Sequence, residues 1–313
     1  MTADVIVLHK LNPWALEGLD KNFRAHHAWQ APDQAKFIAE LAPKVRGMAC
    51  SGHGPVGPAL LDKLPKLEMV SVFGVGYDGV DVKACSARKV RVSNTPDVLT
   101  SDVADLAIGL TIATLRGVVV GDRFVRAGQW LKGGLPLFEK LGGKTVGIIG
   151  MGRIGQAIAQ RCAACETTVV YHGPRKKDVP YRYYPDLAAM AKDCQVVIVA
   201  CPGGEATKNL VNAKVIEALG QGKKGYLVNI SRGSVVEEPA LVQALVDGKL
   251  AGAGLDVFVD EPKVPEALFK LDNVVLQPHV GSATTATRKA MADLVVNNLI
   301  EHFAGRKLLT PVN

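Results

Sequence analysis

Short apolar runs rich in β-branched residues alternate with longer stretches of helical pattern along most of the chain. The runs read DVIVLH, GMACSG, MVSVFG, TVGIIG, TTVVYH, QVVIVAC, GYLVNIS, AGAGLDVF and NVVLQPH. This alternation is typical of βαβ units, in which helices join parallel strands and cover both faces of the sheet. Because so many strands are more than one small domain needs, the pattern predicts an α/β fold with two Rossmann-like or flavodoxin-like domains built on parallel sheets.

The two expected domains do not divide the chain into halves. A glycine-rich turn falls near the middle, and after residue 282 the apolar spacing is that of one long helix over residues 283–303. We therefore expect a first domain of residues 1–98 that is completed by residues 283–313, with a second domain of residues 99–282 inserted between. In this arrangement the active site would lie in the cleft between the domains.

The 313-residue chain is 48% apolar and 21% charged, as is usual for globular proteins. Its formal net charge of +7 could suit a nucleic acid, but the Lys and Arg residues are scattered and no arginine-rich run with interleaved aromatics occurs. A small anionic substrate or cofactor explains the positive charge more simply, so we expect no nucleic-acid partner.

The first residues lack the features of a secretory signal, and the most apolar long segment, residues 103–121, is interrupted by Asp105 and Arg116. That segment is shorter than the roughly 20 apolar residues that a membrane span needs. Six cysteines in such a chain favour free thiols, and the pair Cys162 and Cys165 has no second pair at zinc-finger spacing. We therefore expect a cytoplasmic protein without a metal site or a membrane partner.

The segment KTVGIIGMGRIGQAIAQRC contains Gly150, Gly152 and Gly155 directly after an apolar strand and directly before a helical pattern. A dinucleotide-binding turn requires this context. The first glycine would permit the tight turn, the second would let a pyrophosphate approach the backbone, and the third would let the helix pack on the strand. Free N–H groups at the helix N-terminus would bind the phosphates. The alternative is that the glycines only form a tight turn.

The stretch VVYHGPRKK, residues 169–177, lies about twenty residues after the glycine turn, where an NAD-binding chain usually carries an acidic residue. His172 holds that place, and Arg175 and Lys176 follow it. Without a carboxylate to repel a 2′-phosphate, the stretch predicts that NADP(H) is preferred over NAD(H), with these two cations as the phosphate contacts. Pro174 leaves open which cation is the main contact, and a solvated basic loop is the alternative interpretation.

Polar groups also follow three later strands: Arg232 after LVNIS, Asp256 and Glu261 after AGAGL, and His279 after NVVLQP. The carboxyl ends of parallel strands meet at one edge of a sheet, so we expect these side chains to converge. Reducing a carbonyl by hydride requires a proton donor, a role that suits His279 with Glu261 on its other ring nitrogen. Arg232 can donate two hydrogen bonds to a carboxylate and the neighbouring keto oxygen. Each residue alone could instead be a capped loop residue, a turn residue or a surface charge.

Four ordered motifs carry a resemblance: GMGRIG, the ISRG of residues 230–233, the GLDVF of residues 254–258 with Glu261 and Pro262 after it, and QPHVGSAT. Together they resemble the D-2-hydroxyacid dehydrogenase family. Within it, SNTPDVLTSDVADLAIGL, RAGQW and ACPGGEATKNLV make the chain most similar to NADPH-dependent glyoxylate/hydroxypyruvate reductases.

The resemblance implies that Arg232 binds the substrate, that His279 is the acid/base with Glu261 as its partner, and that Asp256 contacts the nicotinamide side of the cofactor. Further cofactor contacts are expected from Val103, Arg153, Ile154, Cys201, Pro202 and Ile230.

The family holds its substrate carboxylate on main-chain N–H groups of a glycine-rich loop, which matches FGVGYDGVD here. Val75 and Gly76 are the expected donors, and Ser51 and Gly52 are expected to line the same pocket. A plain strand-ending turn is the alternative.

The sequence thus predicts an NADPH-dependent reductase of glyoxylate and hydroxypyruvate. Alternatives are a dehydrogenase of another substrate such as phosphoglycerate, for which the chain lacks an extra regulatory domain, and a dinucleotide-sensing corepressor, for which it lacks extended tails. Formate dehydrogenases have Gln in place of Glu261. A long apolar helix over residues 103–120 and the loop from Trp130 to Phe138 favour a homodimer.

Overall fold

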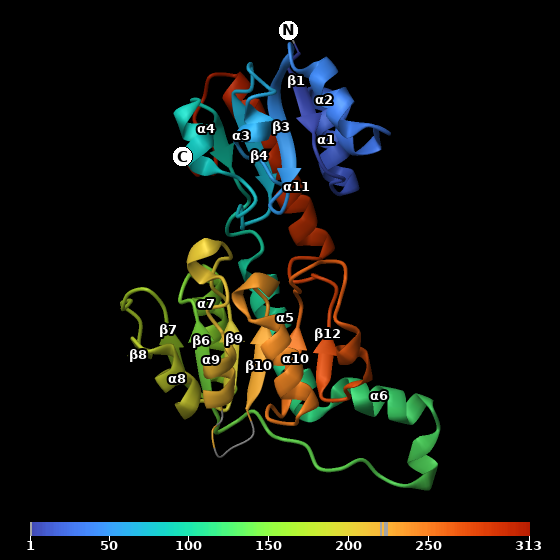
Figure 1. The fold of residues 1–313 in the computed structure, drawn as a ribbon, viewed down its shortest axis with the longest axis vertical. Helices are drawn as coiled ribbons and strands as arrows, with labels where there is room; N and C mark the ends of the chain where they lie inside the picture. The colour runs from blue at the N-terminus through green and yellow to red at the C-terminus, as the bar shows by residue number, and fades with distance from the viewer. Residues whose placement is uncertain (1, 220, 222–224) are drawn as a thin grey trace. The chain divides into compact units, whose positions relative to one another are not determined.

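The computed structural model describes residues 2–219, 221 and 225–313. The chain forms two compact units, which are drawn in Figure 1. Unit 1 consists of Met1–Leu99 with Ser282–Asn313, and unit 2 consists of Thr100–Gly281. The boundaries expected from the sequence differ from these by one residue at each crossing. Each unit is built on one parallel sheet, and this confirms the predicted α/β fold class.

Unit 1 has a five-stranded parallel sheet in the order β2-β1-β3-β4-β5. Its elements are β1 (Asp4–Val7), α1 (Pro13–Asn22), β2 (Arg24–His27), η1 (Ala28–Gln30), α2 (Gln34–Leu41), β3 (Val45–Ser51), α3 (Pro58–Leu61), β4 (Met69–Phe73), α4 (Val82–Ala87), β5 (Arg91–Ser93) and α11 (Thr285–Phe303).

The two faces of the unit 1 sheet pack differently. Alternate residues of the central strands, such as Met48 and Val70, belong to a buried cluster that also contains Ile38 of α2. On the other face, Ser71 donates its hydroxyl to the carbonyl of Val295 in α11 at 3.0 Å. Helix α11 therefore packs on β4, near the middle of the sheet (Figure 1).

Unit 2 has a seven-stranded parallel sheet in the order β12-β11-β10-β9-β6-β7-β8. Its elements are α5 (Thr100–Arg116), α6 (Val118–Arg126), η2 (Gln129–Lys132), β6 (Thr145–Ile149), α7 (Arg153–Ala164), β7 (Thr168–His172), β8 (Arg182–Tyr184), α8 (Leu187–Asp193), β9 (Val196–Val199), η3 (Glu205–Thr207), α9 (Ala213–Ala218), β10 (Tyr226–Asn229), η4 (Gly233–Val235), α10 (Glu238–Val246), β11 (Gly252–Leu255), η5 (Glu266–Lys270) and β12 (Val274–Leu276).

Helices α5 and α7 pack against each other, and α5 also contacts β10, β11 and β12. Helices α8, α9 and α10 form a second buried cluster with the strands. In the sheet, β6 lies between β7 and β9, so the chain leaves β6 toward one edge and later returns on its other side. Ligands of open parallel sheets bind at such a switch point, outside the carboxyl ends of the strands.

Three strands, β2, β5 and β8, were not among the apolar runs from which strands were predicted. All three are edge strands of their sheets, and their sequences are RAHH, RVS and RYY. An edge strand pairs on one side only and is short and polar in many proteins, because these features discourage pairing with other chains. Such strands therefore lack the apolar run that marks an interior parallel strand.

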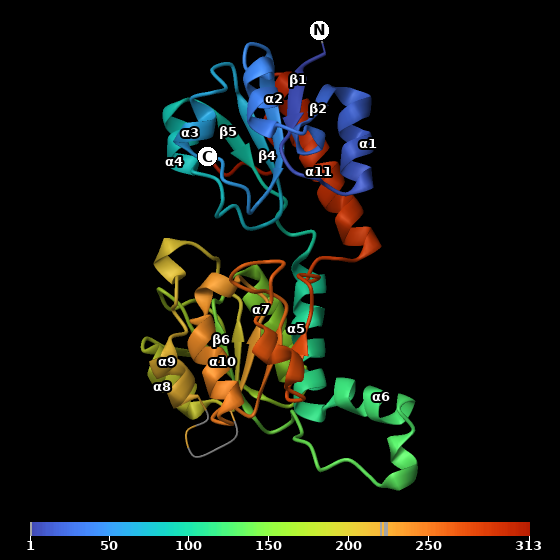
Figure 2. The ribbon, with the colours of Figure 1, turned by 45° about the vertical axis from the view of Figure 1, so that its right-hand side comes forward.

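Unit 2 carries an exposed segment formed by α6, η2 and the chain as far as Glu139, which extends away from the sheet in Figure 2. Helix α6 buries none of its residues. Among the described residues, the large apolar side chains exposed on this segment are Val118, Val119, Val125, Trp130, Leu131, Leu137 and Phe138.

No single helix in the described part of the chain is long and apolar enough to cross a membrane. Taken together, α5 and α6 have the length and apolar composition of a span, but the two helices are bent by 61° relative to each other.

Candidate active site

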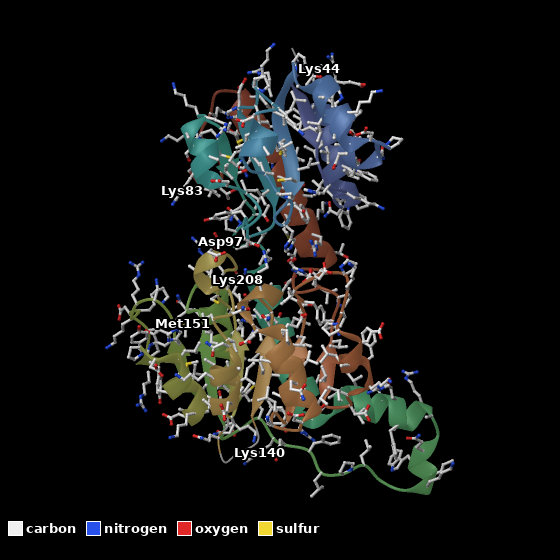
Figure 3. The ribbon with its side chains drawn as sticks, viewed as in Figure 1. Lys44, Lys83, Asp97, Lys140, Met151 and Lys208 are labelled. Atoms are coloured by element: carbon white, nitrogen blue, oxygen red, sulfur yellow. The ribbon has the colours of Figure 1, made fainter. Side chains whose placement is uncertain are left out.

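The glycine-rich turn joins β6 to α7 at the carboxyl end of β6, an interior strand of the unit 2 sheet. Gly150 has φ +98°, and a Cβ there would lie 2.7 Å from the backbone N and Cα of Cys201. A Cβ on Gly155 would lie 1.9 Å from the carbonyl oxygen of Gly150, so the helix start packs directly on the turn. Glycine is therefore required at both positions. Met151, inside this turn, is labelled in Figure 3.

Gly152 differs from the other two glycines, because a Cβ there would meet open space. It is the N-cap residue of α7, and no side chain caps this helix end. Arg153 and Ile154 form its first turn. The N-terminal N–H groups of α7, together with the helix dipole, suit a phosphate anion at this point. The turn therefore fits the pyrophosphate of a dinucleotide, the group for which the sequence predicted it.

The other side chains expected to contact the cofactor lie around the same edge of the unit 2 sheet. Cys201 and Ile230, which follow β9 and β10, are buried, and Pro202 beside Cys201 is exposed. Val103, in the first turns of α5, is buried, and its Cγ2 would lie 3.5 Å from a Cβ on Gly281. These residues come from three different segments of unit 2.

The basic strand end after β7 lies beside the turn, because β7 is the neighbour of β6. His172 ends the strand, and its Nδ1 lies 2.9 Å from the carbonyl oxygen of Tyr184 in β8. Arg175 and Lys176 follow on an exposed loop, and within the described residues neither forms an ion pair. The loop thus presents two cations to solvent at the place where a dinucleotide ribose is bound in this fold.

A histidine–carboxylate pair lies at the other end of the same edge, after β11 and β12. Nδ1 of His279 lies 2.7 Å from Oε2 of Glu261, and the two side chains are about equally accessible, at 31% and 29%. The N–H of Phe258 donates to Oε1 of Glu261 at 3.0 Å, so the carboxylate itself is fixed. His279 has φ +55°, an uncommon conformation for this residue, and its N–H donates to the carbonyl of Asp256.

Asp256 is buried, and both of its carboxylate oxygens accept backbone hydrogen bonds. The N–H of Val280 donates to Oδ1 at 2.7 Å and that of Gly281 to Oδ2 at 2.9 Å. Desolvation raises the pKa of this carboxyl, and the two N–H groups oppose the rise. Asp256 was expected to contact the nicotinamide. That contact stays a prediction, and the two hydrogen bonds to the carboxylate fix the segment that carries His279.

Arg232 follows β10, the strand beside β11, and its Nη1 donates to the carbonyl of Ser231 at 2.8 Å. A Cβ on Gly203 would lie 2.6 Å from Cγ of Arg232, so the arginine stem packs in the space that this glycine leaves. A Cβ on Gly233 would lie 2.0 Å from the carbonyl carbon of Phe258. Arg232 is thus brought next to the segment that holds Glu261.

Asn229, which the sequence reasoning missed, positions the arginine. This buried side chain accepts from the N–H of Ser231 at 3.0 Å and donates to the carbonyl of Arg232 at 3.0 Å. The signal was present in the sequence, since Asn favours turns in which its side chain bonds the backbone two residues later. The residues that shape this turn are therefore the five of NISRG, which includes Asn229.

The residues expected to bind substrate in unit 1 gather at the carboxyl ends of β3 and β4. A Cβ on Gly52 would lie 2.0 Å from the carbonyl oxygen of Gly76, so these two loops touch. Asn94 donates its side-chain amide to the carbonyl of Val75 at 2.8 Å. Within the described residues, the N–H groups of Val75 and Gly76 donate no hydrogen bond to the protein. Two adjacent backbone donors of this kind suit an anion.

His9 in unit 1, which was also not predicted, contacts the loop that follows β3. Its Nδ1 lies 3.4 Å from the N–H of Ser51, which identifies this nitrogen as the acceptor. Burial lowers the pKa of His9, so the neutral ring that this contact needs is the favoured form. A Cβ on Gly54 would lie 1.8 Å from the His9 ring, so the loop after β3 closes over it.

Known proteins share these features. Residues 108–281 match the family model described as D-isomer specific 2-hydroxyacid dehydrogenase, NAD binding domain. Over 309 residues, covering 98% of both chains, the protein is 49% identical to hydroxyphenylpyruvate reductase of Plectranthus scutellarioides and 46% identical to glyoxylate/hydroxypyruvate reductase A of Arabidopsis thaliana.

Among solved structures, the NADPH-dependent glyoxylate/hydroxypyruvate reductase of Sinorhizobium meliloti, in complex with NADP and malonate, matches with a TM-score of 0.92 and 45% identity. The match covers 100% of this chain and 97% of that one. The resemblance predicted from the four motifs is thereby confirmed. The chain belongs to the D-isomer specific 2-hydroxyacid dehydrogenase family and is an oxidoreductase of that family.

Proposed function

We propose that the protein reduces small 2-keto acids, glyoxylate and hydroxypyruvate above all, to 2-hydroxy acids with NADPH as the reductant. The observation that carries the proposal is the His279–Glu261 pair at 2.7 Å, on the same sheet edge as a glycine turn fitted to a dinucleotide. When it is bound, the reduced nicotinamide supplies the hydride that the keto carbon accepts. The protein's own residues bind the two reactants and supply the proton.

In this proposal His279 is the general acid. Its Nδ1 is paired with Glu261, so Nε2 is the nitrogen that would give its proton to the oxygen of the reduced carbonyl. The carboxylate stabilises the protonated ring and fixes its orientation. In the reverse direction the same nitrogen accepts the proton of the hydroxy acid.

Arg232 would bind the substrate through its guanidinium, whose planar donors match a carboxylate and the adjacent keto oxygen. Positive charge beside that oxygen polarises the bond that the hydride attacks. The N–H groups of Val75 and Gly76 are proposed as additional donors to the substrate carboxylate, with Ser51 and Gly52 lining the pocket. Their support is the family resemblance and the pair of adjacent N–H groups described above.

Arg153 and Ile154 at the start of α7, with Gly150, Gly152 and Gly155, are proposed to hold the pyrophosphate. Val103, Cys201, Pro202, Ile230 and Asp256 are proposed to line the rest of the dinucleotide site, and His172 to lie at its ribose.

Preference for NADPH is proposed from the basic strand end. Arg175 and Lys176 would pair with the 2′-phosphate, and no carboxylate at the end of β7 opposes it. The Sinorhizobium relative was solved with NADP.

Replacing Arg175 by Ala tests the cofactor preference directly. Losing one charge-assisted hydrogen bond, about 2 kcal/mol, should raise the KM for NADPH by roughly thirtyfold. The KM for NADH should stay the same, because NADH has no 2′-phosphate. Lys176→Ala, measured beside it, tells which cation contributes more. A parent enzyme that prefers NADH, or variants that weaken both nucleotides equally, would refute the proposed preference.

A larger aromatic keto acid is the second candidate substrate. It is favoured by one observation, the 49% identity to a protein named hydroxyphenylpyruvate reductase. A panel of glyoxylate, hydroxypyruvate, hydroxyphenylpyruvate and 3-phosphohydroxypyruvate, each measured with both reduced cofactors, separates the possibilities by kcat/KM. No turnover of any 2-keto acid would refute the proposed activity and leave a nucleotide-binding role of the corepressor kind.

A cytoplasmic homodimer is proposed as the working form. All six cysteines are free, as is usual in a reducing compartment. The apolar side chains of the α6–Glu139 segment, with Leu131 at 94% and Leu137 at 98% exposure, need a covering surface, and a second copy of the chain would supply it. Light scattering of the parent and of Leu131→Asp should then give a dimer and a monomer, respectively.

A further inference from the structure

The loop that carries Arg175 and Lys176 is fastened by the side chain of one buried tyrosine. The N–H of Lys177 donates to the hydroxyl oxygen of Tyr171 at 2.7 Å, and the same hydroxyl donates to the carbonyl of Lys177 at 3.2 Å. Tyr171 lies in β7 and has no accessible surface. One hydroxyl therefore bonds both polar backbone groups of Lys177, near the middle of the loop that joins β7 to β8.

The start of the loop is fastened by the neighbouring strand. Tyr183 of β8 donates its hydroxyl to the carbonyl of Gly173 at 3.0 Å. Its ring centre lies 5.3 Å from that of Tyr171, with a tilt of 46° between the planes, so the two tyrosines support each other. Gly173 and Lys177 are thus each held, and only Pro174, Arg175 and Lys176 lie between them.

Such fastening matters because long cationic side chains on a mobile loop lose conformational freedom when they bind an anion. A loop that is already ordered before binding loses less, and its affinity for the anion is correspondingly higher. Pro174 adds to this order, since its ring fixes the backbone at the start of the cationic part.

The hydroxyl of Tyr171 is not needed for packing, because a phenylalanine would fill the same buried volume. A buried hydroxyl must find hydrogen-bond partners, and this one finds both of them on the loop rather than within the sheet. The contacts of the hydroxyl thus concern the loop alone.

We propose that Tyr171 is a positioning residue for nucleotide selection: by holding Lys177 it sets the backbone of the Gly173–Lys177 loop, and the discrimination between NADPH and NADH depends on it. The inference rests on the proposed preference for NADPH and adds to it a residue that touches neither nucleotide. Tyr171 acts through Arg175 and Lys176, so its removal should affect only ligands that carry the 2′-phosphate.

The test compares Tyr171→Phe with Tyr184→Phe. Tyr184 is also buried, lies in the neighbouring strand and donates its hydroxyl to Oδ2 of Asp193 at 2.7 Å, away from the loop. Both variants lose one tyrosine hydroxyl at the same sheet edge, so their melting temperatures should fall comparably. For each protein we would measure KM for NADPH and for NADH at saturating keto acid. Calorimetry would give the affinities for adenosine 2′,5′-bisphosphate and adenosine 5′-monophosphate, which need no turnover.

Tyr171→Phe should raise the KM for NADPH and weaken adenosine 2′,5′-bisphosphate about fivefold, the effect of one ordinary hydrogen bond, while NADH and the monophosphate keep their parent values. Tyr184→Phe should leave all four values unchanged. If Tyr171→Phe retains the discrimination of the parent, or weakens all four ligands equally, the inference is overturned while the preference for NADPH stands. A parent that does not discriminate between the nucleotides overturns the cofactor proposal and the inference together.

Discussion

The described residues include a histidine–glutamate pair in each unit, and the two pairs differ in what else the carboxylate binds. In unit 2, Glu261 contacts His279 at 2.7 Å and is held by a backbone N–H. In unit 1, Oε2 of Glu68 lies 3.4 Å from Nε2 of His302, and Arg46 donates to both oxygens of the same carboxylate at 2.6 and 3.0 Å.

The second pair belongs to a partly exposed structural cluster, in which the side chain of His302 is 16% accessible and that of Glu68 is 41% accessible. Arg46 also lies 5.1 Å from the ring centre of Phe303, which stacks edge-on against His302. Burial lowers the pKa of His302, and the bond with Glu68 opposes the fall. The hydrogen bond from Arg46 lowers the pKa of Glu68. An arginine that satisfies the carboxylate leaves the histidine little stabilisation of its charged form, so this pair suits a structural role.

The comparison shows that a histidine beside a carboxylate is not in itself an acid–base device. The carboxylate must pair with the histidine and not with an arginine, and the histidine must lie at the edge of a sheet where a ligand binds. Under the proposed function only the pair in unit 2 meets both conditions, and variants of the two pairs should separate accordingly.

The largest difference is expected for the histidines themselves. His279→Ala should lower kcat for keto acid reduction by about 10²–10⁴-fold, because the proton donor is lost, while NADPH binding stays close to that of the parent. His302→Ala is the matched control and should keep the parent kcat. Steady-state kinetics and fluorescence titration of NADPH measure both quantities. Comparable rates in His279→Ala and the parent would remove this residue from the mechanism.

The two arginines should differ next. Arg232→Lys should raise the KM for keto acid and lower kcat together, by about a hundredfold in kcat/KM, because an ammonium cannot reproduce the planar set of donors. Arg46→Lys makes the same change in the structural cluster and should affect only the melting temperature. Parent kinetics in Arg232→Lys would mean that the guanidinium does not bind the substrate.

A smaller effect is expected for the carboxylates. Glu261→Gln should slow reduction by roughly thirtyfold, the value of a hydrogen bond to a charged group of about 2 kcal/mol. As the pH rises, the rate of Glu261→Gln should begin to decline at a lower pH than the rate of the parent, since the protonated ring loses its anionic neighbour. Glu68→Gln serves as the control with an unchanged profile. The pH dependence of kcat/KM checks this pairing, and superimposable profiles for Glu261→Gln and the parent would contradict it.

The smallest effect concerns stability. The pKa of His302 is lowered from 6.5 by burial and that of Glu68 is lowered from 4.5 by its arginine partner, so the unfolded chain binds more protons at both positions. The contribution of these two groups to the free energy of unfolding is therefore fully present above about pH 6.5. It is lost as the pH falls, first through protonation of His302 and then through protonation of Glu68. Scanning calorimetry between neutral and acidic pH should show a shallower decline of the melting temperature for His302→Gln. An identical decline would exclude a contribution from His302.

Much of the fold follows from residue patterns, because interior parallel strands are buried on both faces and read as unbroken apolar runs. Thus β6, β9 and β10 were predicted, whereas β2, β5 and β8, at the edges, were not. The residue types of the candidate site could also be predicted, since His279 and Arg232 follow apolar strands directly. The contacts that hold these side chains in place could not be predicted from the sequence. The hydroxyl of Tyr171 bonds a loop residue six positions away, and Asp256 holds a segment from another strand. Such pairings are set by the path of the backbone and not by local pattern.

The packing of α11 on the unit 1 sheet has a consequence for the order in which a growing chain can fold. The strands of unit 1 are complete by Ser93, but one face of β4 stays uncovered until Val295 has been made, and Gly47 meets Leu299 and Phe303 on that same helix. All strands of unit 2 are synthesised in the interval. On the ribosome, unit 2 therefore has its whole sequence available before unit 1 does, and the apolar face that awaits α11 is the surface that a chaperone would meet on the nascent chain.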